Sequence, residues 1–587
     1  MASGHVPRLV IPVALSANAL AEEHVHPTAS AGPDEAAALS IVTAGSPDLR
    51  SFAVPTAVAL LSLGVYIRTL MPGVSFSDWA EIQTIPHVLG VAHPTGYPTY
   101  VLLAWAAELV PIGSIAYRAN LLSAVLVALS LATFTVIAQR LGVRPLTAAA
   151  TALALGAVGT VWASATVARV DPLHLLFSAL LIHRTLVWAD RRRPFDLVLG
   201  GLLVGLSLGN HLLTLTVAPF LLLFAVWVGR RQLLARWWLL PAALGAMVLG
   251  LTVYLYIPWA ASRNPPLTYN HPVTLDAVLW LVTGTQFRGQ FQFLSPRGPT
   301  GFVAALPALW GLASSRATLI LPLGGMVGLG WLIRLRPAFG LACLGILLTG
   351  LYFWANYGRL EHYLLVPLLV LAIGMAVALE WVARFLTAGS EWIGRRARRS
   401  AGAAGGPADR SVDNTAEEDA SDPVTTIAVR ADRSIPGLAI GLAGLAFAVA
   451  LAWANWSAAD RSADVSGQTY VSAVFSSLPA NAAIVSYWDA STPLWYGQQV
   501  EGLRPDVLVV DDTNIVYEGW GTAVARIASL ICARPVFAIR NGSGDLATIA
   551  KRFRVTPFIA VRVGAYAPTA TISRTVWQVQ ALGSPSC

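Results

Sequence analysis

The stretch AVPTAVALLSLGVYIRTLM, residues 53–71, decides the class of this protein, because these 19 residues carry a single charge. A run of about 20 apolar residues is what an α-helix needs to cross the hydrocarbon core of a bilayer. Directly after it come PGVSFSDWAE, residues 72–81, and then HPTGYP, residues 93–98. Two carboxylates and a histidine therefore lie just outside a membrane segment, in a chain with only 12% charged residues. Ionisable residues at such a boundary are costly and point to a functional site.

The composition of the whole chain indicates the same class. Its 587 residues are 56% hydrophobic, the mean hydropathy is +0.62, and long apolar runs recur, as in a multi-pass α-helical membrane protein. The net charge of +8 does not indicate nucleic-acid binding, because the arginines cluster between apolar runs, where basic residues mark cytoplasmic loops. No zinc spacing, phosphate loop or dinucleotide fingerprint is present. Cys532 and Cys587 could pair if their domain faces an oxidising compartment.

Eleven apolar segments are predicted as membrane spans, and the arginines orient them. If the run 97–112 is a helix lying on the outer surface, all the arginine-rich loops fall on one side, together with the N-terminus. The positive-inside rule makes that side cytoplasmic, so we expect the C-terminus outside. The predicted spans are 53–71, 119–138, 146–163, 172–189, 195–209, 212–228, 237–258, 317–333, 338–356, 362–384 and 435–456.

This topology divides the chain into five regions. We expect a polytopic membrane catalytic domain over 53–389, with external loops 72–118 and 259–316. A disordered cytoplasmic tail is expected before it, over 1–52, and a disordered cytoplasmic linker after it, over 390–434. The last transmembrane helix is then 435–456, and an external domain follows over 457–587.

The external domain is predicted to be a small α/β domain. Its helix-like stretches lie near 468–478 and 519–532. They alternate with strand-like apolar runs at 483–488, 507–511, 535–539 and 558–563.

Asp78 and Glu81 are the candidate catalytic residues. They are three positions apart, so on a helix they share a face. At a helix start they would instead form a capping box, with Asp78 as N-cap and Glu81 at N3. The two interpretations are compatible, since a capped helix start also holds a carboxylate rigidly. A carboxylate beside a membrane-level cavity could accept a proton from an attacking hydroxyl or hold a divalent cation, and the spacing does not choose between these roles.

His93 and Tyr97 lie in a stiff loop, because two prolines fix φ and Gly96 permits a tight turn. They are candidate substrate contacts, and the alternative is that the loop only reverses the chain. His211 interrupts the apolar stretch 197–228, as a polar residue does at a turn or in a break that lines a cavity. A purely structural, hydrogen-bonded histidine is the alternative for His211.

Three further candidates lie at the predicted external ends of spans. Asp171, in the sequence Arg169-Val170-Asp171-Pro172, would face the same cavity as Asp78 or cap the helix that follows. A phosphate substrate needs at least one arginine, because the guanidinium group matches phosphate oxygens with two parallel hydrogen bonds. Arg359, close to His362 at the start of a predicted span, is the best candidate. Its alternative role is to anchor that span at the lipid headgroups.

Taken together and in order, the motifs resemble a bacterial membrane family related to the animal transmembrane protein 260, an O-mannosyltransferase. No single motif suffices, but the resemblance extends over most of residues 55–512. It rests on SDWAE (77–81), HPTGYP (93–98), GLSLGNH (205–211), LYIP (255–258), NP (264–265), TG (283–284), YWD (487–489) and GLRPDV (502–507).

That family belongs to the C-type membrane glycosyltransferases, in which the first external loop carries an acidic catalytic residue. The resemblance implies a cell-membrane enzyme with an extracytoplasmic active site. It would transfer a sugar such as mannose, with inversion, from a polyprenyl-phosphate donor to a protein or glycan acceptor, for example a protein Ser/Thr hydroxyl. By resemblance Asp78 takes the catalytic position with Glu81 beside it. Substrate contacts are expected from His93, Tyr97, Asp171, His211, Arg359 and His362.

Two departures from the family pattern affect this assignment. The family often has Glu-Val-Tyr where this chain has Arg169-Val170-Asp171, which leaves the role of Asp171 open. It often has Arg where this chain has His362, so the phosphate contact is expected at Arg359. No cofactor is implied, although a divalent cation stays an alternative, and the expected partners are the lipid-linked donor, the acceptor and membrane lipid, with no nucleic acid.

A transporter or flippase of lipid-linked saccharides is the competing function, since it would use the same cavity without chemistry. Acidic residues in the middle of spans would favour transport, whereas Asp78, Glu81 and Asp171 are all predicted at the external rim. A non-catalytic scaffold whose external domain binds a cell-wall polymer is the third class.

Overall fold

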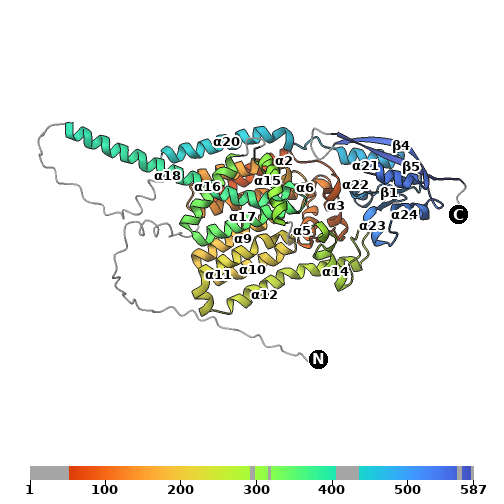
Figure 1. Cartoon of the computed structure of the whole chain (residues 1–587), viewed down its shortest axis with the longest axis horizontal. Coiled ribbons are helices and arrows are strands. Elements are labelled where there is room, and N and C mark those ends of the chain that lie inside the picture. The colour runs from red at the N-terminus through yellow and green to blue at the C-terminus, as the bar shows by residue number, and fades with distance from the viewer. Residues whose placement is uncertain (1–51, 291–297, 315–318, 405–434, 565–570, 584–587) are drawn as a thin grey trace, which may run out of the picture. The chain divides into compact units, whose positions relative to one another are not determined.

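The computed structural model describes residues 52–290, 298–314, 319–404, 435–564 and 571–583. The tail predicted over 1–52 therefore lies almost entirely outside the described residues. The described chain begins with a large set of apolar helices and ends with a small domain built around a β-sheet (Figure 1).

Every segment predicted as a span contains an apolar helix. Among the described residues, seven helices are long and apolar enough to cross a membrane, and the pair α7 (Pro145–Ala157) and α8 (Gly159–Ala165), bent by 75°, would make an eighth. The seven are α6 (Ile115–Arg140), α9 (Asp171–Arg191), α11 (Ala218–Ala235), α12 with α13 (Leu239–Ser262), α17 (Pro337–Asn356), η6 with α18 (Glu361–Arg396) and α20 (Ile435–Ala459).

Shorter apolar helices account for the other predicted segments. They are α2 (Ala53–Arg68), α10 (Pro194–Leu208) and α16 (Ile320–Leu335). A further short apolar helix, within α15 (Gly298–Ser314), falls in the predicted external loop 259–316 and corresponds to no predicted span. The run left out of the predicted spans contains α5 (Pro98–Glu108), whose 11 residues make a helix of about 16 Å, roughly half the hydrocarbon thickness.

The helix α18 contradicts one predicted boundary. It extends from Leu365 to Ala404, so residues 390–404 are helical where a disordered linker was expected. Side-chain pairs one turn apart support this extension: Arg395 lies 3.6 Å from Glu391, and the Arg396 guanidinium lies 5.2 Å from the centre of the Trp392 ring. The remainder of the predicted linker, 405–434, lies outside the described residues.

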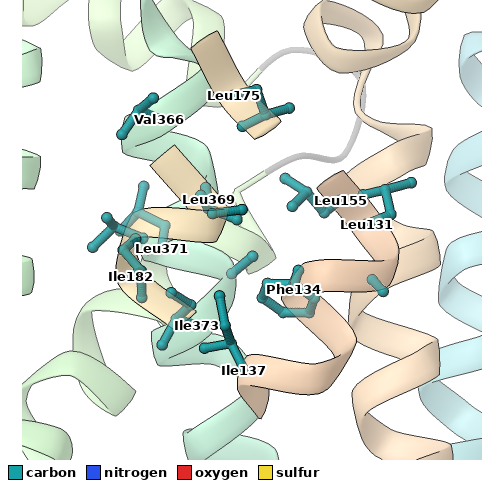
Figure 2. Packing of buried hydrophobic residues seen from close by; sticks show 14 of the residues in the cluster. Leu131, Phe134, Ile137, Leu155, Leu175, Ile182, Val366, Leu369, Leu371 and Ile373 are labelled. Carbon is teal, nitrogen blue, oxygen red and sulfur yellow. The ribbon is translucent and has the colours of Figure 1, made fainter. Parts of the chain in front are cut away.

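The main core lies where α6, α7, α9 and α18 meet, and their apolar side chains converge in Figure 2. Small residues let some helices approach closely, as is common where lipid gives no hydrophobic drive to helix association. A Cβ added at Gly328 of α16 would lie only 1.7 Å from the carbonyl oxygen of Gly374 in α18. The labelled side chains of this core are Leu131, Phe134, Ile137, Leu155, Leu175, Ile182, Val366, Leu369, Leu371 and Ile373.

The C-terminal domain is the α/β domain that the sequence predicts. Its five-stranded sheet has the order β2-β1-β3-β5-β4. The strands β1 (Ala483–Ser486), β2 (Leu508–Asp511) and β3 (Val536–Ile539) pair in parallel, and β4 (Phe553–Gly564) and β5 (Thr571–Ala581) pair antiparallel. The helices are α21 (Ser466–Ser477), α22 (Trp488–Gln499), α23 (Asp512–Tyr517), α24 (Ala523–Leu530) and α25 (Ser543–Ala550).

The sequence does not reveal β5, because polar residues interrupt its apolar ones and leave no long apolar run. Val576 and Val579 are buried, whereas their sequence neighbours Thr575, Gln578 and Gln580 are polar. Cys532 is disulfide-bonded, and its predicted partner, Cys587, lies outside the described residues.

Short elements between α2 and α6 position the functional residues. They are α3 (Ser77–Ile82), α4 (Ile85–Val88) and α5, and a backbone bridge joins Val91 to Thr268. Near the latter lie α14 (Leu275–Val282) and the 3-10 helix η4 (Thr285–Gln290). The loops of this region are thus tied to the second long external segment predicted from the sequence.

Candidate active site

A cavity of about 360 Å³ collects most of the residues that the sequence singles out. Its wall combines α3, the loop that follows α4, the segments that lead into α9 and α18, the turn before α11, residues of η4 and of the loop before α14, and two residues of the C-terminal domain. The lining residues are Asp78, Trp79, Ile82, His93, Pro94, Tyr97, Ala168, Arg169, Val170, Asp171, His211, Tyr269, Gln286, Phe287, Tyr357, Leu360, His362, Tyr363, Trp488 and Thr513.

Asp78 presents its carboxylate to this cavity. Its side chain is 58% exposed, and its Oδ1 accepts a hydrogen bond of 2.7 Å from the indole Nε1 of Trp488. Its Oδ2 lies 4.0 Å from Nε2 of His93. The capping-box interpretation is wrong, because Phe76 is the N-cap of α3 and no side chain caps this helix. Asp78 therefore stands inside the first turn, with its carboxylate available to a substrate.

Glu81 lies behind the cavity and holds His93. Its side chain is only 2% exposed, and its Oε2 pairs with Nδ1 of the His93 ring. Its Oε1 accepts a hydrogen bond of 2.8 Å from the His93 backbone N–H. On the other side of the ring, Nε2 lies 3.1 Å from the hydroxyl of Tyr97, which donates to the Pro94 carbonyl at 2.9 Å. Both ring nitrogens of His93 are thus held by protein groups.

The surroundings of His93 favour its charged form. Burial lowers the pKa of this histidine, but the nearby carboxylates of Glu81 and Asp78 outweigh burial and raise the pKa to about 9. Burial raises the pKa of Glu81, and the charge of His93 offsets that rise in part. At neutral pH the cavity wall therefore carries an imidazolium group next to the Asp78 carboxylate.

Arg169 and Asp171 form a second charged pair on the wall. The Nε of Arg169 donates to Oδ2 of Asp171 at 3.1 Å, and the guanidinium carbon lies 5.4 Å from the centre of the Trp79 ring. Asp171 is the first residue of α9 and makes no capping hydrogen bond with its side chain. Asp171 thus contacts Arg169, which is the one arginine among the cavity-lining residues that the structure describes.

Two histidines stand near this pair. His211 accepts a hydrogen bond of 3.1 Å at Nδ1 from the backbone N–H of Leu213, so the neutral ring carries its proton on Nε2. Burial lowers the pKa of His211, against the opposing effect of Asp171. The ring of His362 packs edge-on against Tyr363, with 4.4 Å between the ring centres.

The structure brings together six of the eight residues that the sequence nominated. Asp78, His93, Tyr97, Asp171, His211 and His362 line the cavity, and Glu81 supports it from behind. Arg359 is outside the lining. It is exposed and takes a left-handed backbone conformation with φ of 52°, between Tyr357 and Leu360, which do line the cavity.

Several lining residues carry no functional signal in the sequence. Arg169 belongs to the motif Arg169-Val170-Asp171-Pro172, in which the sequence singles out Asp171 and the departure from the family pattern but gives Arg169 no role. Trp488 stood in the YWD motif, which carried the resemblance without a role. Tyr269, Gln286, Tyr357, Tyr363 and Thr513 gave no signal, because aromatic and small polar residues are frequent in loops of this kind.

The described residues contain no group of three or more His, Cys, Asp or Glu side chains placed to hold a metal ion.

Two comparisons with known sequences bear on this site. The family model described as the N-terminal domain of the protein O-mannosyl-transferase TMEM260 matches residues 78–234, a range that contains Asp78, His93, Arg169 and His211. The curated protein O-mannosyl-transferase TMEM260 of Mus musculus is 33% identical over 227 residues, or 37% of this chain. The match covers 32% of the mouse protein, about a third of its length.

Solved structures resemble the chain over nearly its whole length. The crystal structure of ArnT from Cupriavidus metallidurans bound to undecaprenyl phosphate matches with a TM-score of 0.52 and 16% identity, covering 89% of this chain and 97% of ArnT. Its apo form gives a TM-score of 0.52 at 15% identity, with the same coverage. The fold class expected from the sequence is therefore confirmed, and this chain resembles the TMEM260 family in sequence and ArnT in fold.

Proposed function

We propose that the protein is a membrane glycosyltransferase that moves a sugar from a polyprenyl-phosphate donor to an extracytoplasmic acceptor, with inversion at the anomeric carbon. The observation that carries the proposal is one cavity that holds both an exposed carboxylate, Asp78, and an oriented arginine, Arg169. An acceptor hydroxyl needs a proton acceptor, and a lipid phosphate needs a cation. ArnT, whose fold is similar, was crystallised with undecaprenyl phosphate.

In the proposed reaction the acceptor oxygen attacks the anomeric carbon of the donor from the face opposite the phosphate. The bond between the anomeric carbon and the phosphate oxygen breaks, and its electron pair leaves with the polyprenyl phosphate. Asp78 takes the proton of the acceptor hydroxyl. The leaving phosphate is already anionic and needs no strong acid, so stabilisation of its charge by a fixed cation is the main requirement.

Arg169 meets that requirement better than Arg359, the arginine favoured by the sequence alone. Asp171 binds the Nε of Arg169 at 3.1 Å, which fixes the plane of the guanidinium group while its Nη atoms carry further donors. A phosphate group can receive two parallel hydrogen bonds from such a fork. His362 and the Nε2–H of His211 are proposed as additional contacts, since both line the same cavity.

His93, held by Glu81, is proposed to stabilise the ionised form of Asp78 before the reaction. A cation close to a carboxylate favours its charged state, and the distance of 4.0 Å between Asp78 Oδ2 and His93 Nε2 is short enough for that effect. Tyr97 keeps the imidazole in place through the contact of 3.1 Å with Nε2.

We further propose mannose as the sugar and a protein Ser/Thr hydroxyl as the acceptor, because the mouse relative is named an O-mannosyl-transferase. The aromatic side chains of Trp488, Tyr269 and Tyr363 on the cavity wall suit the apolar face of a hexose. The proposed location is the cell membrane, with the cavity on the extracytoplasmic side.

The test is a donor-turnover assay with purified protein. Polyprenyl-phosphate mannose, labelled in the sugar, is incubated with and without a Ser/Thr-containing acceptor peptide, and released polyprenyl phosphate is measured. Acceptor-dependent release together with label on the peptide supports the proposal. In proteoliposomes, movement of labelled donor between the leaflets without release of polyprenyl phosphate would instead support the transporter.

A further inference from the structure

The C-terminal domain packs against the segment that carries Asp78. Phe76, two residues before it, is buried, with its ring centre 5.5 Å from that of Tyr470 in α21. The guanidinium carbon of Arg574 in β5 lies 4.6 Å from the centre of the Phe76 ring. At Gly467 an added Cβ would lie 2.1 Å from the Val74 carbonyl oxygen, so α21 rests directly on this backbone. The start of α3 is therefore built against the C-terminal domain.

Trp488 reaches from this domain to the catalytic carboxylate itself. It is the first residue of α22, and its indole N–H donates to Oδ1 of Asp78 at 2.7 Å. Its ring meets three others edge-on, with ring centres 5.9 Å from His93, 5.9 Å from Tyr269 and 5.7 Å from Trp495. These contacts fix the plane of the indole and hence the direction of its N–H.

The residues on either side of Trp488 are anchored as well. Asp489 forms an ion pair with Arg574, and the hydroxyl of Tyr487 accepts a hydrogen bond of 3.0 Å from Nη1 of the same arginine. Arg574 is only 5% exposed. The backbone that carries the indole is thus anchored on both sides. A group that positions another side chain needs such support.

We propose that Trp488 is a positioning residue that holds Oδ1 of Asp78, so that Oδ2 is presented to the acceptor hydroxyl. The inference rests on the proposed function and goes beyond it, because it makes the C-terminal domain part of the active site. An indole N–H is a donor only and cannot accept a bond in return. It therefore favours the ionised carboxylate, which is the form that can take a proton.

Other titratable groups interact electrostatically with Asp78, and the test leaves all of them in place. They come from α3, the loop after α4 and the segment that leads into α18, and they are Glu81, His93, Tyr97, Tyr357, His362 and Tyr363. A change confined to Trp488 therefore leaves these groups in place while it removes the indole N–H.

The test is Trp488→Phe in the full-length protein, with turnover measured as acceptor-dependent release of polyprenyl phosphate. Phenylalanine keeps an aromatic ring in the same packing but has no N–H. We expect kcat to fall roughly 10-fold to 100-fold, because the carboxylate is no longer oriented, while the KM for the donor stays within about 2-fold because Arg169 is untouched. The acidic limb of the pH profile of kcat should move up by about 0.5–1 unit.

Trp520→Phe is the matched control. The indole of Trp520 also donates to a carboxylate, Oε2 of Glu518 at 3.2 Å, but Trp520 does not line the cavity. This variant should keep both kcat and the pH profile of the wild-type protein. A loss of kcat in both variants, without a shift of the acidic limb in Trp488→Phe, would show a general effect on the domain and overturn the positioning role.

The failures of the two proposals are distinguishable. Wild-type protein that releases no polyprenyl phosphate overturns the proposed function, and the role of Trp488 falls with it. Wild-type protein that turns over, with Trp488→Phe equal to it in kcat and pH profile, overturns the role of Trp488 alone and leaves the glycosyltransferase in place.

Discussion

Asp78 can be separated from its neighbours by a substitution that keeps its shape. Asparagine at this position can still accept the Trp488 hydrogen bond but cannot take a proton. We expect Asp78→Asn to reduce turnover by roughly 10²–10⁴-fold with unchanged folding, because the side chain is 58% exposed. Released polyprenyl phosphate is the measurement, and Asp276→Asn, in the first turn of α14 and outside the cavity lining, is the control. Near wild-type turnover in Asp78→Asn would reduce Asp78 to a partner of Trp488.

The two candidate arginines make different predictions for donor use. Arg169→Ala should lower kcat/KM for the donor by roughly 10-fold to 100-fold, the range for hydrogen bonds to a charged group, mainly through KM. Arg169→Lys keeps the charge but loses the planar fork and should fall between. Arg359→Ala should change little, because Arg359 lies outside the cavity lining. Should Arg359→Ala prove the more damaging, the phosphate binds at the segment before α18.

The pair of His93 and Glu81 predicts a loss of function at high pH. The pKa of His93 is raised from 6.5 to about 9 in the folded protein. Its imidazolium therefore stabilises the fold fully below pH about 6.5, and this contribution is lost as the pH rises through about 9. We expect turnover and Tm both to fall through that window. Glu81→Gln removes the carboxylate that contributes most to raising the pKa of His93, so the alkaline limb of turnover should move to lower pH. If this limb does not move, its titration belongs to a group other than His93.

For single residues, the sequence identifies the candidate site residues better than it identifies the side chains that they contact. Asp78, Glu81 and His93 are visible because they are ionisable and adjoin a membrane segment. That Glu81 serves His93, and does not itself face the substrate, depends on which side of a six-residue helix is buried. That Asp78 is held by Trp488 depends on the packing of a separate domain, which no local pattern encodes.

Among the elements, α16 and α18 pair through closely approaching glycines, of which Gly328 makes the closest approach. A side chain at Gly328 would collide with the backbone of α18, because its Cβ would lie 1.7 Å from the Gly374 carbonyl oxygen. We expect Gly328→Ala to destabilise the protein by about 1–3 kcal/mol through overpacking. Gly330, on the same helix, has nothing within 4 Å of an added Cβ, and Gly330→Ala should be neutral or slightly stabilising.

Thermal unfolding in detergent compares these two variants directly. Equal Tm values for Gly328→Ala and Gly330→Ala would show that α16 can move away from α18 at little cost. The sequence predicts both helices from their apolar length. It does not predict their contact, because small residues occur on several faces of these helices and only the fold selects the face that pairs.

For the whole molecule, the predicted topology places the C-terminal domain and the region after the main membrane domain on opposite sides. Ser476 in α21 and Ser390 in α18 are both exposed, and of the described cysteines Cys343 is buried and Cys532 is disulfide-bonded. In intact cells a membrane-impermeant thiol reagent should label Ser476→Cys but not Ser390→Cys. Labelling of Ser390→Cys should require permeabilised cells, and equal access to both positions would contradict the topology.

The overall architecture is the part that the sequence predicts most fully. Apolar length identifies the helices, and alternating strand-like and helix-like runs identify the α/β domain. One predicted boundary was wrong, because α18 continues through residues 390–404, where side-chain pairs one turn apart support a helix. One strand was missed, because β5 carries too few consecutive apolar residues to be recognised.

The hydrogen bond between Trp488 and Asp78 also has a consequence for biosynthesis, since its two ends are 410 residues apart in the chain. A ribosome must translate most of the message before the indole can reach the carboxylate. A nascent chain already inserted in the membrane would hold Asp78 and Arg169 but leave Asp78 unoriented. In the proposed glycosyltransferase, an incomplete chain would therefore lack the oriented base, and full activity would come only with the completed C-terminal domain.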